Sequence, residues 1–397
     1  MAFTKAFIPY GGYWSSPFSK WQGSFANEHA IELAGATARA FFEKRKIDPA
    51  TMDNLYHGQT VPQTHCFYGG PWLAGLLGSP AITGPVVGQA CITGITCTKL
   101  AAQDIEDSIA RTSLVVTLDR CSNGPHIYYP SQTAPGATGT SEDWVWDNFG
   151  FDPWAKNSMI QTAENVAKEH GVSREQQDEV TARRYAQYQD ALADDRAFHR
   201  RFMVPVVIGK GKKAATVESD EGIFPTTLEG LRALKPVLPD GTITFGSQTH
   251  PADGNAGLIV TTRERAAELA ADRKVVIQIL GMSTKRTKKG YMAAATVPAA
   301  RAVLAETGLK ASDIAAVKTH NPFAVNDIVL SKELGFDLEA MNNYGSSIVF
   351  GHPQAPTALR ILIELIEELV LKGGGLGLFA GCAAGDTAAG CVVKVST

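Results

Sequence analysis

Four residues of the sequence carry side chains that can perform nucleophilic and acid–base chemistry: Cys91, His320, His352 and Cys382. Cys91 follows an apolar segment and a glycine, and it precedes a helical pattern, which predicts that it lies at the start of a helix. The free N–H groups and partial positive charge of a helix N-terminus stabilise a thiolate, so this position would activate a cysteine. A small, unreactive cysteine packed in the core is the alternative interpretation.

His352 stands between a glycine and a proline, in front of a second helical pattern. If the two helix starts face each other, the imidazole can act as the base that activates Cys91. The alternative is a core histidine bonded to the backbone. His320 opens a turn at the end of an apolar strand, the edge at which open α/β sheets place ligands. Cys382 lies among small residues, where a cysteine of depressed pKa can serve as an acid or a base.

An internal repeat positions these residues. Residues 38–58 and 300–320 align without a gap, and each indicates an amphipathic helix, a short turn and an apolar strand. At nearly the same offset, each copy continues with a further predicted helix and strand: 93–109 with 113–117, and 357–371 with 375–379. Short apolar strands that alternate with helices are typical of sheets covered on both faces. The chain is therefore predicted to be an α/β protein built from two copies of one fold.

The two copies are separated by an inserted segment of a different character. It contains a loop rich in Gly, Ser and Trp, two helical patterns and several basic clusters. A locally basic insertion could grip a polyanionic substrate, although a solvated lid with ordinary surface charge fits the same pattern. The predicted organisation is an N-terminal half, an inserted loop domain, a return to the N-terminal half and a C-terminal half: 1–120, 121–251, 252–273 and 274–397.

Composition and charge exclude several classes of protein. The chain has 397 residues, of which 44% are apolar and 19% charged, as is typical of a globular protein of two or three domains. A net charge of −3 gives no overall reason to expect nucleic acid, and the apolar runs are too short for a membrane span. Six cysteines without regular spacing indicate free thiols in a reducing compartment, so a cytoplasmic enzyme is expected. The nine histidines lack ligand-like spacing, so no metal site is predicted.

The motifs around the four residues resemble those of the thiolase family along almost the whole chain. The segment 89–94, Gln-Ala-Cys-Ile-Thr-Gly, is similar to the thiolase nucleophile loop, and Gly351-His352-Pro353 is similar to the family's histidine motif. Further matches occur in the family's order: 100–105, 121–125, 162–167, 173–179, 226–229, 234–236 and 253–254. The resemblance implies a duplicated thiolase-like fold of five layers, α-β-α-β-α, with an inserted loop domain.

The resemblance also implies a role for each reactive group. Cys91 would take the acyl group as a thioester, and His352 would hold Cys91 as a thiolate and bind the substrate thioester oxygen together with His320. Cys382 would exchange the proton at the α-carbon of the acetyl group. The backbone N–H groups of Cys91 and Ala384 would receive the oxyanion formed on the acyl-cysteine, and such charge stabilisation is commonly the largest catalytic contribution. Coenzyme A is expected as a substrate, with no permanently bound cofactor.

Several positions depart from the family pattern. Many thiolases carry Asn-Glu-Ala-Phe where this chain has His-Asn-Pro-Phe at 320–323, and the leading histidine resembles the sterol-carrier-protein type, His-Asp-Cys-Phe. A histidine there could contact the oxyanion directly, whereas asparagine works through a water. Residues 248–250 read Gln-Thr-His in place of Ala-Ser-Gly, which puts the usual coenzyme A contacts there in doubt. Ala384 and Tyr344 stand where the family has a glycine and an asparagine.

Basic and aromatic residues of the inserted segment are candidates for ligand binding. The phosphates of coenzyme A favour Arg and Lys, and its adenine and pantetheine favour a partly apolar groove. The residues predicted to bind coenzyme A are Arg183, Arg184, Lys210, Lys212, Lys213 and Thr249. Aromatic side chains that would either line an acyl pocket or pack within the loop are Trp144, Trp146, Phe149 and Trp154.

The leading prediction is an acyltransferase that cleaves a 3-oxoacyl-CoA with coenzyme A through an acyl-enzyme on Cys91, in the degradation of fatty or aromatic acids. One alternative is a biosynthetic Claisen-condensing enzyme, against which Cys382 argues. Another is a thiolase subunit that is active only with a small OB-fold and zinc-containing partner, which the altered loops favour. The resemblance further implies a homodimer or homotetramer. The predicted partners are thus acyl-CoA and coenzyme A, with no nucleic acid and no membrane span.

Overall fold

The computed structural model describes residues 2–397, leaving aside the side chain of Lys212. The first half of the chain forms β1 (Phe7–Ile8), β2 (Tyr13–Ser15), β3 (Ser19–Lys20), α1 (Ala30–Arg45), β4 (Asn54–Gly58), α2 (Gly69–Leu77), β5 (Val86–Val87), α3 (Thr93–Glu106) and β6 (Thr112–Arg120). The inserted segment forms β7 (His126–Tyr129), β8 (Thr140–Asp143), α4 (Trp146–Gly150), α5 (Met159–His170), α6 (Arg174–Arg196), β9 (Val206–Ile208), β10 (Ala215–Val217) and α7 (Leu228–Arg232). The remainder forms β11 (Ala252–Thr261), α8 (Arg263–Leu269), β12 (Val276–Arg286), α9 (Thr296–Thr307), β13 (Ala316–His320), α10 (Ala324–Leu334), α11 (Ser347–Phe350), α12 (Ala355–Leu371), β14 (Gly374–Ala383) and β15 (Thr387–Ser396).

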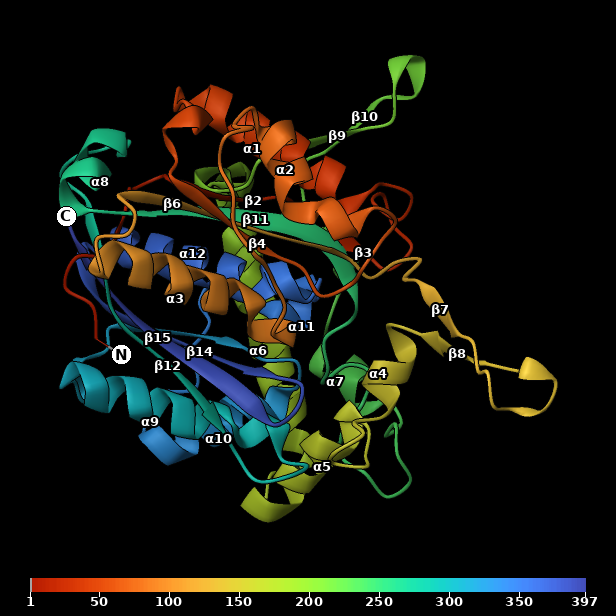
Figure 1. Cartoon of the computed structure of the whole chain (residues 1–397). Helices are drawn as coiled ribbons and strands as arrows, with labels where there is room; N and C mark the ends of the chain where they lie inside the picture. The colour runs from red at the N-terminus through yellow and green to blue at the C-terminus, as the bar shows by residue number, and fades with distance from the viewer. Residues whose placement is uncertain (1) are drawn as a thin grey trace.

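Five layers of secondary structure stack on one another (Figure 1). Helices α1 and α2 cover the outer face of β4, β6 and β11, and helices α3 and α12 fill the centre of the molecule. Strands β12, β14 and β15 form the next layer, which α9 and α10 cover from the other side. The α-β-α-β-α architecture expected from the sequence is therefore confirmed.

One sheet runs through both halves in the order β13-β14-β15-β12-β1-β11-β6-β4-β5, with β2 and β3 paired to β11. Strand β1 pairs antiparallel with both β11 and β12 and so joins the two halves. In the first copy β4 lies parallel to β6, with Asn54 opposite Ser113. In the second copy β13 lies parallel to β14, with Ala316 opposite Gly377. The same parallel pair at equivalent positions of the repeat confirms the duplication.

The central helix α12 is buried almost throughout because α3 and both halves of the sheet surround it. Its charged stripe, which includes Arg360, Glu364 and Glu367, is buried as well, and each of these side chains has an ion-pair partner. Gly94, in the first turn of α3, packs directly on Leu359, since a Cβ atom at Gly94 would lie only 2.8 Å from the Leu359 Cβ. This close approach brings the starts of the two central helices together. Within residues 2–397, no helix is long and apolar enough to cross a membrane.

Buried charges tie the inserted segment to the core. Arg360 of α12 donates two hydrogen bonds to Asp220 of the inserted segment, at 2.6 and 2.8 Å, and one to Glu364 at 3.0 Å. The guanidinium also packs against the rings of Phe18 and Phe350. Removal of one partner from such a cluster leaves an uncompensated buried charge, which is strongly destabilising. The cluster therefore holds the insertion against the helix whose first turn follows His352.

Candidate active site

Cys91 lies at the start of a helix, as the sequence predicts. It occupies the middle of a short 3-10 helix, Ala90–Ile92, that runs directly into α3. The hydroxyl of Thr93 accepts a hydrogen bond from the Gln89 N–H and donates one to the carbonyl before Cys91, which fixes this turn. Burial raises the pKa of the Cys91 thiol to about 12, while the backbone N–H groups of Ala384 and of Cys91 itself act in the opposite direction. The resting side chain is therefore a neutral thiol beside two backbone donors.

His352 is held by its backbone and by one ring nitrogen. Its N–H donates to the His250 carbonyl at 2.9 Å, and its Nδ1 lies 2.6 Å from Thr357 Oγ1 in the first turn of α12. Its Nε2 is buried and has no hydrogen-bond partner among the described residues. Burial first, and then the neighbouring His320 and His250, lower the pKa of His352 well below its usual value. The ring is therefore neutral, and a lone pair on Nε2 can accept a proton.

His320 is the last residue of β13 and has the same pattern of contacts. Its Nδ1 lies 2.9 Å from the hydroxyl of Ser347, which also accepts from the Asn321 N–H and donates to the Asn321 side-chain oxygen. Its Nε2 is a second buried imidazole nitrogen without a partner in the described chain. Burial lowers the pKa of His320 to about 3. With its one proton donated to Asn321, the Ser347 hydroxyl accepts from His320 Nδ1–H and leaves a lone pair on Nε2, whereas the Nε2–H tautomer requires this hydroxyl to turn from Asn321 to His320 Nδ1.

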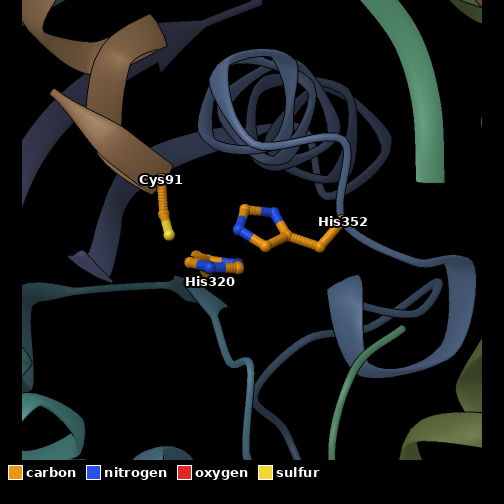
Figure 2. Close-up of side chains that lie close together, drawn as sticks. All are labelled: Cys91, His320 and His352. Atoms are coloured by element: carbon orange, nitrogen blue, oxygen red, sulfur yellow. The ribbon is translucent and has the colours of Figure 1, made fainter. Parts of the chain in front are cut away.

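These three side chains converge although they come from distant parts of the sequence. Figure 2 shows the sulfur of Cys91 directed toward the rings of His320 and His352. One thiol sulfur and two ring nitrogens all lie within 4.8 Å of one another, and the two ring centroids are 4.2 Å apart. A nucleophile with a neutral base in reach and a second imidazole beside it can perform acyl transfer.

Cys382 lies in β14, fully buried close to Cys91. Its sulfur accepts a hydrogen bond of 3.2 Å from the side-chain amide of Asn326, which itself donates to the Ala293 carbonyl. Burial, and then the nearby Cys91, raise the pKa of the Cys382 thiol, while the Asn326 amide opposes the rise. Sequence reasoning missed Asn326, whose only local signal is its place three residues after the His-Asn-Pro-Phe segment.

Gln354 is a second functional residue that sequence reasoning missed. Its side-chain oxygen accepts a hydrogen bond from Cys91 Sγ at 3.6 Å. Its backbone adopts φ 63° and ψ −104°, a conformation that residues other than glycine rarely take and that costs about 1–3 kcal/mol. The only signal in the sequence is that Gln354 follows the histidine motif. Strained residues of this kind cluster at active sites.

Asp119, also missed, links the two copies of the fold beneath the site. Its carboxylate accepts hydrogen bonds from the Thr60 N–H and hydroxyl, the Val61 N–H and the Ala355 N–H, all between 2.7 and 2.9 Å. Ala355 begins α12, so this carboxylate fixes the residue directly after Gln354. Burial raises the pKa of Asp119 to about 7, against the effect of its four donors.

Two cavities meet beside Gln354, the hydrogen-bond partner of Cys91. The larger, of about 800 Å³, has a mostly apolar wall that includes Cys91, His352, Thr249, Trp146 and Phe323. The smaller, of about 520 Å³, lies beside Ala90 and Trp144. Four residues line both cavities: Phe149, Met159, Gln354 and Ala384. Three of the four candidate aromatics therefore line a cavity, whereas Trp154 is exposed at the surface.

The residues predicted to bind coenzyme A do not lie together in the structure. Thr249 lines the larger cavity, where its hydroxyl contacts the Ser347 carbonyl. Arg183 points instead to Glu339, with which it forms an ion pair. Lys210 and Lys213 lie at the β9–β10 hairpin, which projects from the molecule, and neither belongs to the wall of the two cavities as described (Figure 1). The side chain of Lys212 lies outside the described part of the structure.

The prediction that Arg184 binds coenzyme A is wrong. Its side chain is fully buried, and its guanidinium donates to Asp327 and Gln187 at 2.8 Å and to the Leu338 carbonyl at 2.9 Å. Arg183 and Arg184 of α6 thus hold the insertion against α10 and the segment that follows it. Sequence alone did not reveal this, because a buried arginine differs from an exposed one only in its tertiary partners.

Comparisons with known proteins agree with this geometry. The family model described as "Thiolase, N-terminal domain" matches residues 14–264, and "Thiolase, C-terminal domain" matches residues 273–395. An acetyl-CoA acetyltransferase of Escherichia coli is 28% identical, over 94% of this chain and 95% of that protein. A 3-ketoacyl-CoA thiolase of Pseudoalteromonas translucida is 30% identical over 91% of each, and a beta-ketoadipyl-CoA thiolase of Pseudomonas knackmussii is 29% identical over 92% of this chain and 94% of that protein.

Solved structures show the same likeness over the whole chain. The acetyl-CoA acetyltransferase of Bacillus anthracis superposes with a TM-score of 0.90, at 25% identity, and the match covers 99% of both chains. Human mitochondrial 3-ketoacyl-CoA thiolase in complex with CoA superposes equally well, at 25% identity, over 100% of this chain and 99% of that one. Both family domains, their order and the complete fold are present here. The chain belongs to the thiolase family.

Proposed function

We propose that the protein cleaves a 3-oxoacyl-CoA with coenzyme A, giving acetyl-CoA or another CoA thioester and a shortened acyl-CoA. One observation carries this proposal: the sulfur of Cys91 and the free Nε2 atoms of His320 and His352 meet in one buried space beside the larger cavity. Relatives named 3-ketoacyl-CoA thiolase and acetyl-CoA acetyltransferase support it.

In the first half-reaction, Cys91 Sγ attacks the 3-oxo carbon of the substrate and its proton passes to His352 Nε2. The bond between carbons 2 and 3 then breaks, and its electron pair becomes the enolate of the departing thioester. His320 and His352 face the enolate oxygen, where a preorganised donor is typically worth about 10²–10³ in rate. The thiol of Cys382 delivers the proton that converts the enolate into acetyl-CoA.

In the second half-reaction, coenzyme A enters the larger cavity and attacks the acyl group on Cys91. The thiolate of Cys382 accepts the proton of the coenzyme A thiol. The tetrahedral oxyanion is placed beside the backbone N–H groups of Cys91 and Ala384, the same donors that oppose the rise in the Cys91 pKa. Collapse of this intermediate releases the shortened acyl-CoA, and the protonated His352 returns its proton to Cys91.

The inserted segment, residues 121–251, supplies much of the wall of the larger cavity, so we propose it as the coenzyme A-binding part of the chain. Thr249 and the apolar side chains around it would contact the pantetheine arm. Coenzyme A acts here as a substrate. The free thiols of all six cysteines in the described chain support the cytoplasm as the compartment.

Purified protein, 3-oxoacyl-CoA and coenzyme A test the proposal directly. Formation of acetyl-CoA should depend on added coenzyme A, and Cys91→Ser should abolish it. Cys97→Ala is the matched control, because Cys97 lies in α3, which follows the 3-10 turn of Cys91, but is not part of the described wall of either cavity. A Cys91→Ser variant that retains the parent rate would overturn the proposal. Condensation of acetyl-CoA without the reverse cleavage would favour a biosynthetic enzyme instead.

We further propose that the protein is at least a homodimer, paired through β5. This strand ends the sheet, Val86 is half exposed on it, and the ring of Phe67, in the 3-10 turn before α2, is almost fully exposed. An open edge with apolar side chains is a template for pairing with a second chain. Phe67→Glu should lower the molecular mass seen by light scattering, and the parent mass distinguishes a dimer from a tetramer. Activity of the purified chain alone would exclude an obligate OB-fold and zinc partner.

A further inference from the structure

We propose that Cys91, His320 and His352 form a buried binding site for a Zn²⁺ ion, and that occupancy of this site switches off acyl transfer. The inference rests on the proposed function only for its consequence, the loss of acyl transfer. The site itself stands on geometry. A sulfur and two imidazole nitrogens form a ligand set that selects Zn²⁺ over Mg²⁺ and Ca²⁺, which prefer oxygen.

The three donor atoms already lie close to coordination geometry. They fall within 4.8 Å of one another. A tetrahedral Zn²⁺ with bonds of about 2.0–2.3 Å needs its ligand atoms roughly 3.4–3.6 Å apart. Closing the difference requires rotation of the three side chains, which come from the 3-10 turn before α3, the end of β13 and the segment before α12. The spacing rules that found no metal site in the sequence fail here because the ligands come from positions 91, 320 and 352.

The outer contacts of both rings match those of metal-bound histidines. His320 Nδ1 lies 2.9 Å from the Ser347 hydroxyl, and His352 Nδ1 lies 2.6 Å from the Thr357 hydroxyl. When each Nδ1–H donates to its hydroxyl, each Nε2 presents a lone pair to the shared space. Both Nε2 atoms are buried and lack a partner among the described residues. Metal-binding histidines typically use the second nitrogen in this way, which fixes the tautomer and orientation of the ring.

Gln354 is the candidate for a fourth ligand. Its side-chain oxygen lies 3.6 Å from Cys91 Sγ, on the wall of the larger cavity. A tetrahedral ion held by three side chains keeps one open position, which this oxygen or a water from the cavity can fill. The site is specific to chains such as this one, because many thiolases carry an asparagine at the position of His320 and so offer one imidazole fewer.

Binding of one Zn²⁺ ion releases one proton from the site. The Cys91 thiol loses its proton to solvent as the sulfur–zinc bond forms, and the two neutral imidazoles bind through existing lone pairs. The bound ion occupies the sulfur lone pair that attacks the substrate and the His352 lone pair that accepts the thiol proton. Zn²⁺ should therefore compete with acyl-CoA, and an acylated Cys91 should be unable to bind the ion.

The first experiment uses the whole protein after removal of metals with a chelator. Titration with Co²⁺, a spectroscopic substitute for Zn²⁺, should give a thiolate-to-cobalt charge-transfer band at one equivalent per chain, and Zn²⁺ should bleach it. Competition with a chromophoric chelator then measures the Zn²⁺ affinity. Absence of the band and of any binding at micromolar Zn²⁺ would overturn the proposal without any variant.

Variants then assign the ligands. Cys91→Ala should abolish the band, His320→Asn should weaken Zn²⁺ binding by at least about 100-fold, and Ser347→Ala by about 10–100-fold. Cys97→Ala is the control and should bind as the parent does, with far-ultraviolet circular dichroism checking the fold of each variant. Unchanged affinity in both Cys91→Ala and His320→Asn would overturn the site.

Activity measurements distinguish a failure of this inference from a failure of the proposed function. A protein that cleaves 3-oxoacyl-CoA but is not inhibited by Zn²⁺ at concentrations that fill the site would contradict the switch alone. A protein that binds Zn²⁺ as described but cleaves no 3-oxoacyl-CoA would contradict the proposed function and leave the site in place.

Discussion

The imidazole rings of His320 and His352 lie with their centroids 4.2 Å apart, and each presents a buried Nε2 without a partner among residues 2–397. Each ring is held at its other nitrogen by a hydroxyl, that of Ser347 or Thr357. Burial lowers the pKa of both histidines, so the two neutral rings can approach without repulsion. Two hydrogen-bonding groups of the same kind therefore face the sulfur of Cys91, and they can share the work of binding an enolate oxygen.

The contribution of His320 to this work can be measured. His320→Ala should lower kcat by about 10²–10³, as the loss of one oxyanion donor does. His320→Asn should fall between that variant and the parent, because an amide also donates a hydrogen bond but reaches less far. Steady-state kinetics with one 3-oxoacyl-CoA give the comparison. Equal kcat values for the parent and His320→Ala would show that His352 alone binds the oxygen.

Replacement of Gln354 by glycine should raise the stability of the protein and lower its activity. Gln354→Gly removes the strain of φ 63° and should raise the free energy of unfolding by about 1 kcal/mol. The same change removes the acceptor of the Cys91 thiol, so kcat/KM should fall about tenfold. Urea unfolding and the cleavage assay measure the two effects. A variant that is less stable than the parent would mean that the Gln354 side chain outweighs the backbone strain.

The packing of the two central helices depends on the absence of a side chain at Gly94. Gly94→Ala places a Cβ atom 2.8 Å from the Leu359 Cβ and 3.0 Å from the Leu359 backbone nitrogen. Overpacking of this kind typically costs about 1–3 kcal/mol. Gly150→Ala is a suitable control, because a Cβ atom there has open space around it. Thermal unfolding of the two variants should differ, and equal melting temperatures would contradict the close approach of the helices.

Arg360 should be among the most sensitive positions for stability. Arg360→Ala leaves Asp220 buried without its cation, while Glu364 keeps its ion pair with Lys318, and loss of one buried partner typically costs about 3–5 kcal/mol. The control is Arg301→Ala, whose partner Glu333 is partly exposed, and it should cost less than about 1 kcal/mol. Urea unfolding at neutral pH measures both variants. A loss of similar size in the two would show that burial does not set the strength of the Arg360 cluster.

Asp119 should make stability depend on pH. Burial raises its pKa to about 7, above the value of about 3.9 in an unfolded chain. Between these values the folded chain keeps a proton that the unfolded chain has lost, so the free energy of unfolding should fall as pH rises from about 4 to about 7, by at most about 1.4 kcal/mol per pH unit.

The control for this effect is Asp119→Asn, which cannot ionise. Its stability should be lower than that of the parent near pH 5, because the amide cannot satisfy all four donors around it. The gap should narrow toward about pH 8. A gap between the two proteins that is equal at both pH values would contradict the raised pKa of Asp119.

The sequence predicted the parts of the site that leave local signals. Helix periodicity and a preceding glycine placed Cys91 at a helix start, and a glycine and a proline marked His352. Gln354, Asp119 and Asn326 leave no comparable signal, because their roles depend on partners far away in the sequence.

The sequence by itself determined the duplication, through its internal repeat and periodicity, and the resemblance of its motifs to the thiolase family implied the five layers and predicted Cys91 as the nucleophile. Only the tertiary structure decided that His320 and His352 share one space with Cys91 and that Gln354 completes its wall. Tertiary structure also decided that Arg184 is buried in an ion pair with Asp327. The physical reason is that these contacts arise when the two halves and the insertion pack together, and the partners in such packing are not encoded in the local pattern around any one residue.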